Sequence, residues 1–438
     1  MGIRSFLRLL TLVILLISVI ACNDSFVPDD GLDYSHITPH NVYTLYSQTQ
    51  RLRKLSPTGQ ANFIYLTDTH LSDNRLSSPA ILSFLTHNGF SDQVFWGGDA
   101  ITSYGDIEDE WRMHQRLFLG AVQPFAHYYM VRGNHEFTTR IKSNGKGVTY
   151  DGSETAYLLR QHNEPNIVRP ANDPDACYYY ADDPTHKLRY CVFDTTDSIS
   201  STHDAWGTLV HTSSRQLRWM DEHALHHLPE GYGLIVFTHI GLLPQTYHQH
   251  AMLQSLSELI EQTEAPILMV LSGHMHQDFQ TFDAHGILHV LTGSDATYGE
   301  YSYSPFLHDY KRRSYSQSEQ LLDCVSISAD HRCIDMVRIG AGFDRSFHLD
   351  ALQLSLADTT PCRLRADRLH LDKTKSMYWQ CYNAEGYTCA DDTPWSPPSD
   401  VISIDADGTV HPLRTGHAVA MAVSKAGHKE FFHLVVNP

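Results

Sequence analysis

Residues 62–70 read NFIYLTDTH, an apolar run that ends in an aspartate and a histidine two positions apart. The same arrangement, a short apolar run followed by a turn rich in Gly, Asp, Asn or His, recurs along the chain. The runs are Asn62–Thr67, Gln93–Trp96, Tyr128–Val131, Leu188–Phe193, Leu234–Thr238 and Ile267–Leu271. Continuous apolar runs this short are typical of strands buried on both faces. The sequence therefore predicts sheets whose strands lie inside the molecule.

Helix-like stretches separate several of these runs. They are Ile107–Leu119, Ser213–Leu228, which begins with a Ser cap, and Ala251–Thr263. Further strands are predicted at Gly286–Thr292, Leu321–Ile327 and Cys333–Ile339, the last two as a hairpin. Alternating strands and helices predict an α/β layered fold.

Five short polar motifs follow the apolar runs: Asp68-x-His70, Gly98-Asp99, Gly133-Asn134-His135-Glu136, His239 and Gly273-His274-x-His276. Taken singly, each is weak, because such motifs occur by chance. Together they fall where the loops at the carboxyl ends of α/β strands converge on a ligand. Every motif supplies oxygen or imidazole donors, and the chain has no CxxC pair that would favour a thiolate zinc site. The pattern therefore indicates a metal site with nitrogen and oxygen ligands.

From about residue 61 to 295, the motifs follow one another in the order of the calcineurin-like metallophosphoesterase family, which this sequence resembles. The resemblance implies a four-layer α/β/β/α sandwich in which the motif residues hold two metal ions about 3–4 Å apart. Carried over position by position, the implied ligands are Asp68, His70 and His276 for one ion, Asn134, His239 and His274 for the other, and Asp99 as the bridge between them.

The residue types suit this implied chemistry. A bridging carboxylate compensates the charge of both ions, and neutral imidazoles and an amide oxygen complete their shells. Water held between the ions loses a proton near neutral pH, and the bridging hydroxide then attacks phosphorus in line. Mixed ligation suits Zn, Fe or Mn better than Ca and does not choose among them. The resemblance thus implies hydrolysis of phosphate esters, with monoesters and diesters both open.

His135 has a separate role in the family. The histidine at its position faces the leaving group and is the candidate general acid, a role that suits an imidazole because its ordinary pKa lies near neutrality. Glu136 either orients this histidine or is a solvated or capping carboxylate. Purple acid phosphatases carry a tyrosine ligand three residues beyond the bridging aspartate. Thr102 occupies that position here, which disfavours that subfamily.

Loops outside the motifs are expected to select the substrate. They surround Tyr104, Lys142–Asp151 and Tyr298–Tyr315. A phosphorylated small molecule or headgroup is the expected substrate class. The formal charge of −18 disfavours nucleic acid as a partner, because the phosphate backbone of nucleic acid binds to positively charged protein surfaces. The oligomeric state is left open.

Residues 1–22 have the features of a targeting segment. Arg4 and Arg8 precede an apolar stretch over Leu9–Ile20, and Cys22 follows directly after Ala21. A cysteine at this point resembles the bacterial lipoprotein signal, in which it becomes the lipidated N-terminus; an incidental cysteine beside a plain cleavage site is the alternative. Residues 23–60 are predicted to be a tether with a short lead-in helix. We therefore expect a lipid-anchored protein of the bacterial cell envelope, periplasmic or at the outer surface.

An exported chain can form disulfides. Local separations make Cys177–Cys191 and Cys324–Cys333 plausible hairpin staples, and Cys362 has two possible partners in Cys381 and Cys389.

The predicted catalytic domain spans 61–342, and the character of the sequence changes after it. Within residues 346–438, apolar and polar residues alternate at Val401–Ile404 and Phe431–Val436, and Asp405–Gly408 reads as a turn. This pattern predicts a small all-β domain. Trp395–Val436 resembles the second half of bacterial Ig-like repeats. The alternative function is therefore a non-catalytic surface-binding or adhesion protein that works through this domain.

Overall fold

A computed structural model describes most of the chain from residue 28 onward. The described residues are 28–55, 60–71, 77–102, 107–123, 125–136, 140–141, 147–148, 164, 166–173, 176–197, 212–243, 253–296, 301–304, 307–312, 316–357, 360–368, 377–384, 388–390, 393–395 and 398–438. Cys22 and the rest of the predicted targeting segment lie outside these residues. Within them, no helix is long and apolar enough to span a membrane.

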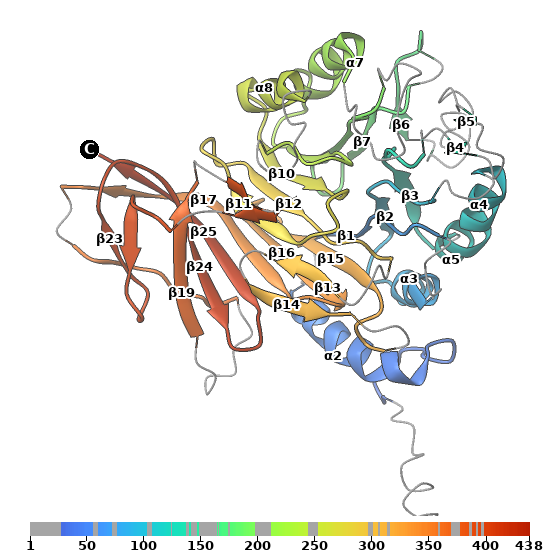
Figure 1. Cartoon of the computed structure of the whole chain (residues 1–438), viewed down its shortest axis with the longest axis horizontal. Helices are drawn as coiled ribbons and strands as arrows, with labels where there is room; N and C mark the ends of the chain where they lie inside the picture. Colours follow the sequence, from blue (N-terminus) through green and yellow to red (C-terminus); the bar gives the residue numbers. More distant parts are fainter. Residues whose placement is uncertain are drawn as a thin grey trace, which may run out of the picture.

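Two large sheets form the centre of the molecule (Figure 1). The nine-stranded sheet has the order β19 (Met377–Asn383), β24 (Gly416–Ser424), β25 (Lys429–Asn437), β17 (Arg345–Ser355), β16 (Cys333–Gly340), β15 (Leu321–Ile327), β1 (Ala61–Leu66), β2 (Gln93–Trp96) and β3 (His127–Met130). The seven-stranded sheet has the order β11 (Phe279–Phe282), β12 (Leu288–Leu291), β10 (Ile267–Ser272), β9 (Gly233–Phe237), β8 (Leu188–Val192), β7 (Tyr179–Asp183) and β6 (Ile167–Val168). The six strands predicted from apolar runs are present with bounds that differ by at most one residue.

The strands that carry the motifs run parallel within each sheet. β1, β2 and β3 are parallel neighbours in one sheet, and β8, β9, β10 and β12 are parallel neighbours in the other. Parallel strands end at the same edge, so the turns that follow them gather there. This pairing brings the five motifs to one edge of each sheet.

Helices cover the outer face of each sheet and give four layers. On the nine-stranded sheet they are α2 (Pro39–Leu55), α3 (Ser77–His87), α4 (Ile107–His114), the π-helical η1 (Gln115–Leu119) and α5 (Gly120–Val122). On the seven-stranded sheet they are α7 (Ser214–Trp219), the π-helical η2 (Met220–Leu225) and α8 (Gln254–Gln262). The Ser213 hydroxyl accepts the Gln216 N–H at 3.1 Å, which confirms the predicted cap.

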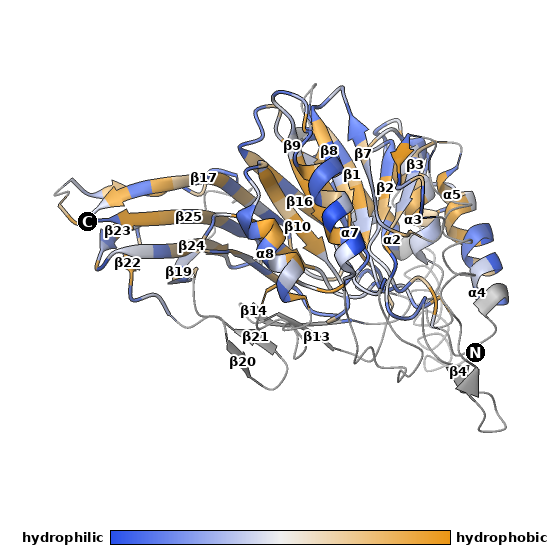
Figure 2. Cartoon of the chain, turned by 90° about the horizontal axis from the view of Figure 1, so that it is seen from above, coloured by the Kyte–Doolittle hydropathy of each residue, from blue (hydrophilic) through white to orange (hydrophobic). Residues whose placement is uncertain are grey.

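The core between the two sheets is rich in aromatic side chains. Phe95 of β2 stacks on Phe237 of β9 with ring centroids 4.3 Å apart, and Phe63 and Tyr190 meet them edge-on or tilted. The apolar colouring of both sheets in Figure 2 follows from this double burial. The predicted α/β/β/α layering is therefore present, and it holds the two motif-bearing sheet edges together.

Four small sheets lie around this core. They are β13 (Tyr301–Ser304) with β14 (Leu307–Lys311), β4 (Arg140–Ile141) with β5 (Gly147–Val148), β20 (Thr388–Ala390) with β21 (Thr393–Trp395), and β18 (Cys362–Arg363) with β23 (Thr409–Pro412) and β22 (Ile402–Ile404).

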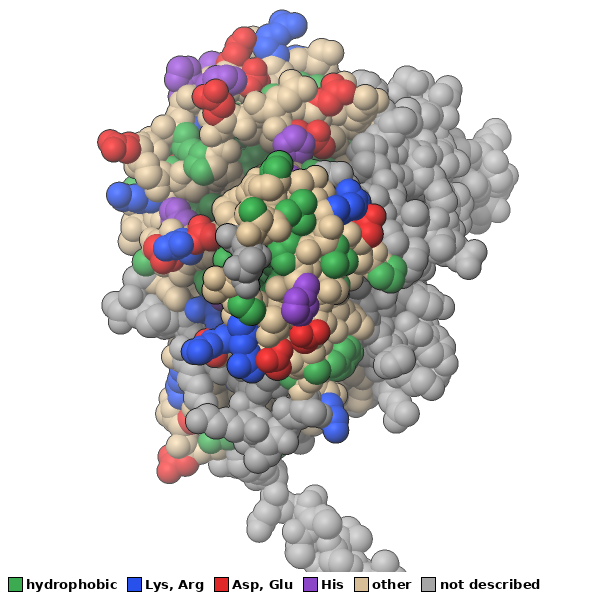
Figure 3. Space-filling model, turned by 90° about the vertical axis from the view of Figure 1, so that its left-hand side faces the viewer, with side chains coloured by type: hydrophobic (Ala, Val, Ile, Leu, Met, Phe, Trp, Pro, Cys, Tyr) green, Lys and Arg blue, Asp and Glu red, His purple; other side chains and the backbone are tan. Residues whose placement is uncertain are grey.

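The described residues of the C-terminal region form strands and no helix, and these strands continue the nine-stranded sheet. β16 and β17 pair antiparallel from Cys333↔His348 to Met336↔Arg345, so pairing crosses the predicted boundary at residues 342–346. β25 then pairs parallel with β17. Beyond it a smaller core of its own forms around Ile402 and Leu434. Figure 3 views the end of the molecule where these strands lie, and charged side chains of both signs are scattered over it.

The predicted hairpin disulfides are wrong for Cys177–Cys191 and Cys324–Cys333. None of the six cysteines whose side chains the structure describes forms a disulfide. Cys191 pairs across the ladder with Tyr180, three residues beyond Cys177. An odd offset turns two side chains to opposite faces, and the two cysteines accordingly belong to different cores. Cys324 lies opposite Val337, four residues beyond Cys333.

Candidate metal centre

The structure brings all seven predicted ligands to one place between the two sheets. Asp68 and His70 follow β1, Asp99 follows β2 and Asn134 follows β3, while His239 follows β9 and His274 and His276 follow β10. Each motif therefore contributes from the carboxyl end of a different parallel strand.

One set of ligand atoms joins Asp68, His70 and His276. His70 Nε2 lies 3.2 Å from His276 Nε2, and His276 Nε2 lies 3.2 Å from Asp68 Oδ1. A second set joins Asp99, His239 and His274. The first set has the members that the family resemblance assigned to one ion. The second has His239 and His274 of the other ion together with Asp99, the assigned bridge, and a third set joins His70, Asp99 and His135.

Asp99 lies between the two sets. Its Oδ2 is 3.1 Å from His239 Nε2 and 4.0 Å from His70 Nε2, so one oxygen faces a nitrogen of each set. Its Oδ1 accepts the backbone N–H of His135 at 2.8 Å, which fixes the orientation of the carboxylate. Asp99 is thus placed where a bridging ligand would be.

Several ligand atoms of the site point their lone pairs at the same position, which is the arrangement that binds a cation. His239 Nδ1 contacts the carbonyl oxygen of Gly97 at 2.8 Å, so that nitrogen donates and Nε2 faces the centre. There Nε2 meets Asp99 Oδ2 at 3.1 Å and Asn134 Oδ1 at 3.0 Å. Lone pairs that converge in this way repel unless a proton or a cation lies among them. The set of imidazole, carboxylate and amide donors fits Zn, Fe or Mn.

Backbone strain is concentrated at these residues. Five of the seven non-glycine residues with positive φ in the described part of the chain are predicted ligands: Asp68, His70, Asp99, His274 and His276, with φ between 40° and 69°. Each such conformation costs of order 1–3 kcal/mol and persists only where the surrounding structure enforces it. Concentrated strain of this kind is typical of functional sites.

Two of the motif glycines pass so close to a ligand carboxylate that no side chain would fit there. A Cβ on Gly133 would lie 2.2 Å from Asp99 Oδ1, and a Cβ on Gly273 would lie 2.3 Å from Asp68 Oδ2. Only glycine lets these turns pass so near the two carboxylates. The glycines of the GNH and GH motifs therefore leave space for the ligand carboxylates on the neighbouring loops.

Glu136 supports the Asp99 loop instead of orienting His135. Its buried carboxylate accepts the backbone N–H groups of Gly133, Asp99 and Ala100 at 2.7–2.9 Å. The imidazole of His135 is held by a different group, since its Nδ1 donates to the carbonyl oxygen of Thr102 at 2.8 Å. Of the two predicted roles for Glu136, the capping role is the one present.

The electrostatics of the site make two of its imidazoles ready to bind a cation but leave a proton on His239. Burial lowers the pKa of that imidazole, but Asp99 and Asp68 outweigh the effect of burial and raise the pKa to about 10. A cation at this position would replace that proton. Burial lowers the pKa of His70 and of His274 to about 3, so both imidazoles are neutral at neutral pH. Burial opposes ionisation of Asp99, but His239 and His135 outweigh it and hold the pKa of that carboxyl well below its usual range. Neutral imidazoles and ionised carboxylates are the forms that ligate metals.

A buried charge cluster that sequence reasoning missed lies behind the His274–His276 turn. Arg338 Nη1 and Nη2 each lie 2.9 Å from an oxygen of Asp278, two residues beyond His276. Arg338 Nε also lies 2.8 Å from Asp323 Oδ1, and Arg345 of β17 pairs with the same aspartate. The side chains of Arg338 and Asp323 are 1% and 0% exposed. The cluster ties the ligand turn to β15, β16 and the first strand of the C-terminal region.

Replacing Arg338 by Met is expected to destabilise the fold by about 3–5 kcal/mol, because the buried carboxylates of Asp278 and Asp323 lose the cation that contacts both and are left with their pairs with Arg345. The measurement is the free energy of unfolding from urea denaturation of the full chain. Arg414→Met is the matched control, since Arg414 pairs with Asp400 at the surface. Its unfolding midpoint should stay at that of the wild type, and an equal loss in both variants would contradict the assignment.

The loops predicted to select the substrate fall largely outside the described residues. Tyr104 lies outside them, as do most of 142–151 and parts of 298–315. Within the described part, Arg312 donates to the carbonyl oxygens of Ala296 and Asp295 at 2.8 and 2.9 Å. Ala296 N–H in turn donates to the Asp68 carbonyl at 3.1 Å. Arg312 thus supports the backbone of a ligand from the far side.

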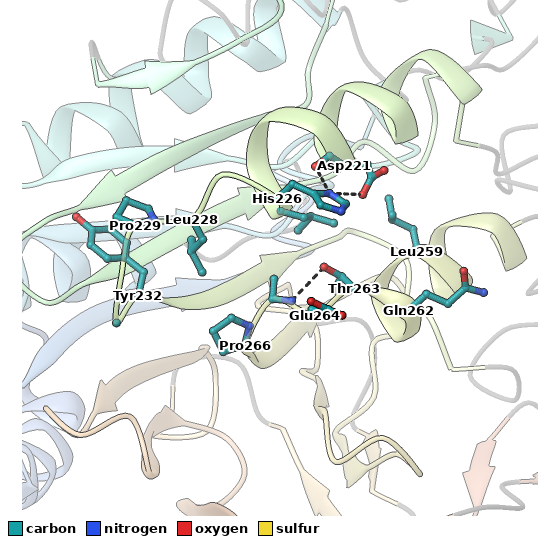
Figure 4. A pocket seen from close by; sticks show the side chains of 13 residues that line it. Asp221, His226, Leu228, Pro229, Tyr232, Leu259, Gln262, Thr263, Glu264 and Pro266 are labelled. Carbon is teal, nitrogen blue, oxygen red and sulfur yellow. Dashed lines mark hydrogen bonds and ion pairs between the residues drawn. The ribbon is translucent and has the colours of Figure 1, made fainter.

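A cavity of about 610 Å³ lies away from the metal centre. Figure 4 shows its lining, which includes Tyr232 and Pro266, the residues just before β9 and β10. Because the predicted ligands follow the other ends of these strands, the cavity is at the opposite sheet edge and has no part in the chemistry of the centre.

Comparison with known proteins connects this geometry to a family. Residues 61–278 match the family model described as calcineurin-like phosphoesterase. No curated protein sequence matches the chain. Among solved structures, the chain is similar to a dimetal phosphatase from Danio rerio (14% identity, TM-score 0.45, 66% of this chain and 99% of that chain covered). It is also similar to a purple acid phosphatase from seeds of yellow lupin, Lupinus luteus (14% identity, TM-score 0.42, 66% and 53% covered).

Proposed function

We propose, from the premise that residues 61–278 form a calcineurin-like metallophosphoesterase domain, that the chain hydrolyses phosphate esters at a centre of two metal ions. The observation that carries the proposal is the cluster of three-residue ligand sets that Asp99 links, with His239 and His274 on one side and His70 and His135 on the other, next to the set of Asp68, His70 and His276. Asp68, His70 and His276 would hold one ion, and Asn134, His239 and His274 the other. Bound ions would supply Lewis acidity and lower the pKa of water.

His135 is proposed to give a proton to the leaving group. Its Nδ1–H donates to the carbonyl oxygen of Thr102. The other ring nitrogen, Nε2, is therefore left for the substrate, and it lies 3.9 Å from Asp99 Oδ2. The side chain is 14% exposed, so a substrate oxygen can approach it, while Asp99 and His70 behind it stay buried. A positioned imidazole contributes about 10²–10⁴-fold to such a proton transfer. Both monoesters and diesters benefit from protonation of the leaving oxygen.

His135→Ala is expected to lower kcat by about 10²–10⁴-fold for alkyl phosphates and to leave the metal content unchanged. The loss should be smaller for nitrophenyl phosphate, whose leaving group needs no proton. Turnover of both ester types and metal content per chain are measured together. His226→Ala, which removes an exposed imidazole beside the far cavity, is the control. Loss of metal from the His135 variant would refute its role as a proton donor.

The direct test of the proposed function is release of nitrophenol from aryl phosphates by the purified full chain, with its metal content. A metal-free and inert protein would overturn the proposal and favour the binding or adhesion alternative. A panel of monoesters, cyclic nucleotides, nucleoside diphosphate derivatives and phospholipid headgroups, run with Zn, Fe and Mn, then distinguishes monoester from diester hydrolysis.

The location is proposed from the sequence. An apolar segment followed by Cys22 supports an exported protein anchored through a lipidated N-terminus. Residues 346–438 are retained as an Ig-like region, supported by their antiparallel strands and separate small core. Replacing Cys22 by Ser is expected to move the protein from the membrane fraction to the soluble fraction. An unmodified N-terminal peptide in the wild-type protein would contradict the anchor.

A further inference from the structure

A cysteine, a histidine and a glutamate form a chain of contacts where β16, β17 and β25 meet, outside the metal centre. Cys333 Sγ lies 3.6 Å from His348 Nδ1. The other ring nitrogen, His348 Nε2, lies 2.6 Å from Glu430 Oε1. A nucleophile in reach of an imidazole that a carboxylate orients is the arrangement that activates thiols and hydroxyls in enzymes.

The sheet register creates this arrangement. Cys333 and His348 are cross-strand partners on β16 and β17, so their side chains share one face. The parallel pairing of β17 with β25 places Phe432 opposite His348. The two rings stack with centroids 4.5 Å apart and planes 11° apart, which fixes the tilt of the imidazole. Glu430, two residues before Phe432, reaches the same face.

Glu430 determines which nitrogen of His348 faces the sulfur. Its carboxylate is fully buried, and its second oxygen accepts the backbone N–H of Arg368 at 3.1 Å. His348 Nε2–H must therefore donate to Glu430, which leaves Nδ1 to exchange a proton with Cys333. Burial lowers the pKa of His348, but the contacts with Cys333 and Glu430 outweigh it and raise the pKa to about 9. An imidazolium beside a thiol favours the thiolate.

Cys333 differs from the other thiols in the described part of the chain. Cys177, Cys191 and Cys324 are buried. Cys362 and Cys381 are partly exposed, but burial raises the pKa of both thiols. Cys333 is also partly exposed, and its partner His348 is 31% exposed, so a small reagent can reach both.

We propose that Cys333 is a nucleophilic thiol that exchanges with low-molecular-weight disulfides, with His348 as its base and Glu430 as the residue that positions His348. In the exchange, the thiol proton resides on Nδ1 in a thiolate–imidazolium pair, and the thiolate Sγ attacks one sulfur of the disulfide. A new S–S bond forms, the bond of the reagent breaks, and the departing thiolate takes the proton from Nδ1. The products are one mixed disulfide on the protein and one small thiol, with no further oxidant.

The test uses the full chain with glutathione disulfide and follows each cysteine peptide by mass spectrometry. In the folded chain, Cys333 is expected to be modified at least about tenfold faster than Cys362 and Cys381. It should also react faster in the folded chain than in the chain unfolded by urea. Cys362→Ser and Cys381→Ser are the matched controls and should leave the rate at Cys333 unchanged. His348→Gln should slow the reaction about tenfold. It should also make the rate rise with pH between 6 and 8 as an ordinary thiol does, while the wild-type rate stays flatter.

Two results would overturn the proposal. One is modification of Cys333 at the rate of the two control cysteines. The other is a His348→Gln variant that keeps both the wild-type rate and the wild-type pH profile, which would make the contact with the imidazole purely structural. Because Glu430 is buried, Glu430→Gln is compared only after its unfolding midpoint matches that of the wild type. Its rate should then fall toward that of His348→Gln.

Discussion

Asp99→Asn is expected to abolish phosphate-ester hydrolysis and to lower the metal content of the purified chain. Asp99 Oδ2 is the oxygen that faces both His239 and His70, so its charge is the one shared by both ligand sets. An amide of the same shape keeps the packing and removes that charge, and two dications at the centre then lack their common compensation. The measurements are turnover of aryl phosphate and metal per chain, on protein whose circular dichroism matches that of the wild type.

The control for this charge change is Asp109→Asn, because Asp109 is exposed and pairs with Arg112 at the surface of its helix. It should keep full activity and full metal content. An Asp99→Asn protein that keeps its metals and its turnover would remove Asp99 from the centre of the mechanism. One that keeps metals but loses turnover would restrict Asp99 to the chemical step.

Ending the chain at Gly342 is expected to prevent formation of a soluble, active protein. The region removed supplies seven side chains to the core between the two sheets: Phe347, Tyr382, Ala384, Val419, Met421, Val423 and Phe431. Burying one large apolar side chain contributes about 1.5–3 kcal/mol, and the net stability of a protein is about 5–15 kcal/mol. The cut also removes Arg345, which pairs with Asp323 in the buried charge cluster. Soluble yield and the unfolding transition are the measurements.

A change in the outer part of the same region serves as the control. Val410 belongs to the smaller C-terminal core, so Val410→Ala should cost at most a few kcal/mol and leave turnover and metal content unchanged. A chain ending at Gly342 that folds and keeps full activity would show that the C-terminal strands are an addition to a self-sufficient catalytic domain. The sheet continuity from β16 to β25 argues for the opposite result.

The layers and the ligand edge were predictable because their signals are local. A run such as Ile267–Leu271 is apolar on both faces, which marks a doubly buried strand, and the histidines directly beyond it mark the loop. The register of parallel strands then has little freedom. The predicted ligands consequently come together in space, with Asp68, His70 and His276 as one set and His239 and His274 beside Asp99 in another.

Features that depend on distant partners were not predictable. Arg338 and Asp323 lie on two strands and Asp278 on a turn, and a charged residue in a strand gives no sign that it is buried. The disulfide predictions failed for a related reason, because spacing along the chain reveals neither which face of a ladder a cysteine occupies nor which residue of the next strand lies opposite it. The role of Glu136 depended on the return of its carboxylate to the Asp99 loop, 37 residues earlier.

The most direct test of the two-metal account is a titration of the chelator-treated full chain with Zn²⁺ or Mn²⁺, with aryl phosphate turnover followed at each step. Two ions should bind per chain, and turnover should become maximal only as the second site fills. The His276→Ala and His274→Ala variants should each bind one ion instead of two. Binding of a single ion at full activity, or turnover that persists without metal, would contradict the account.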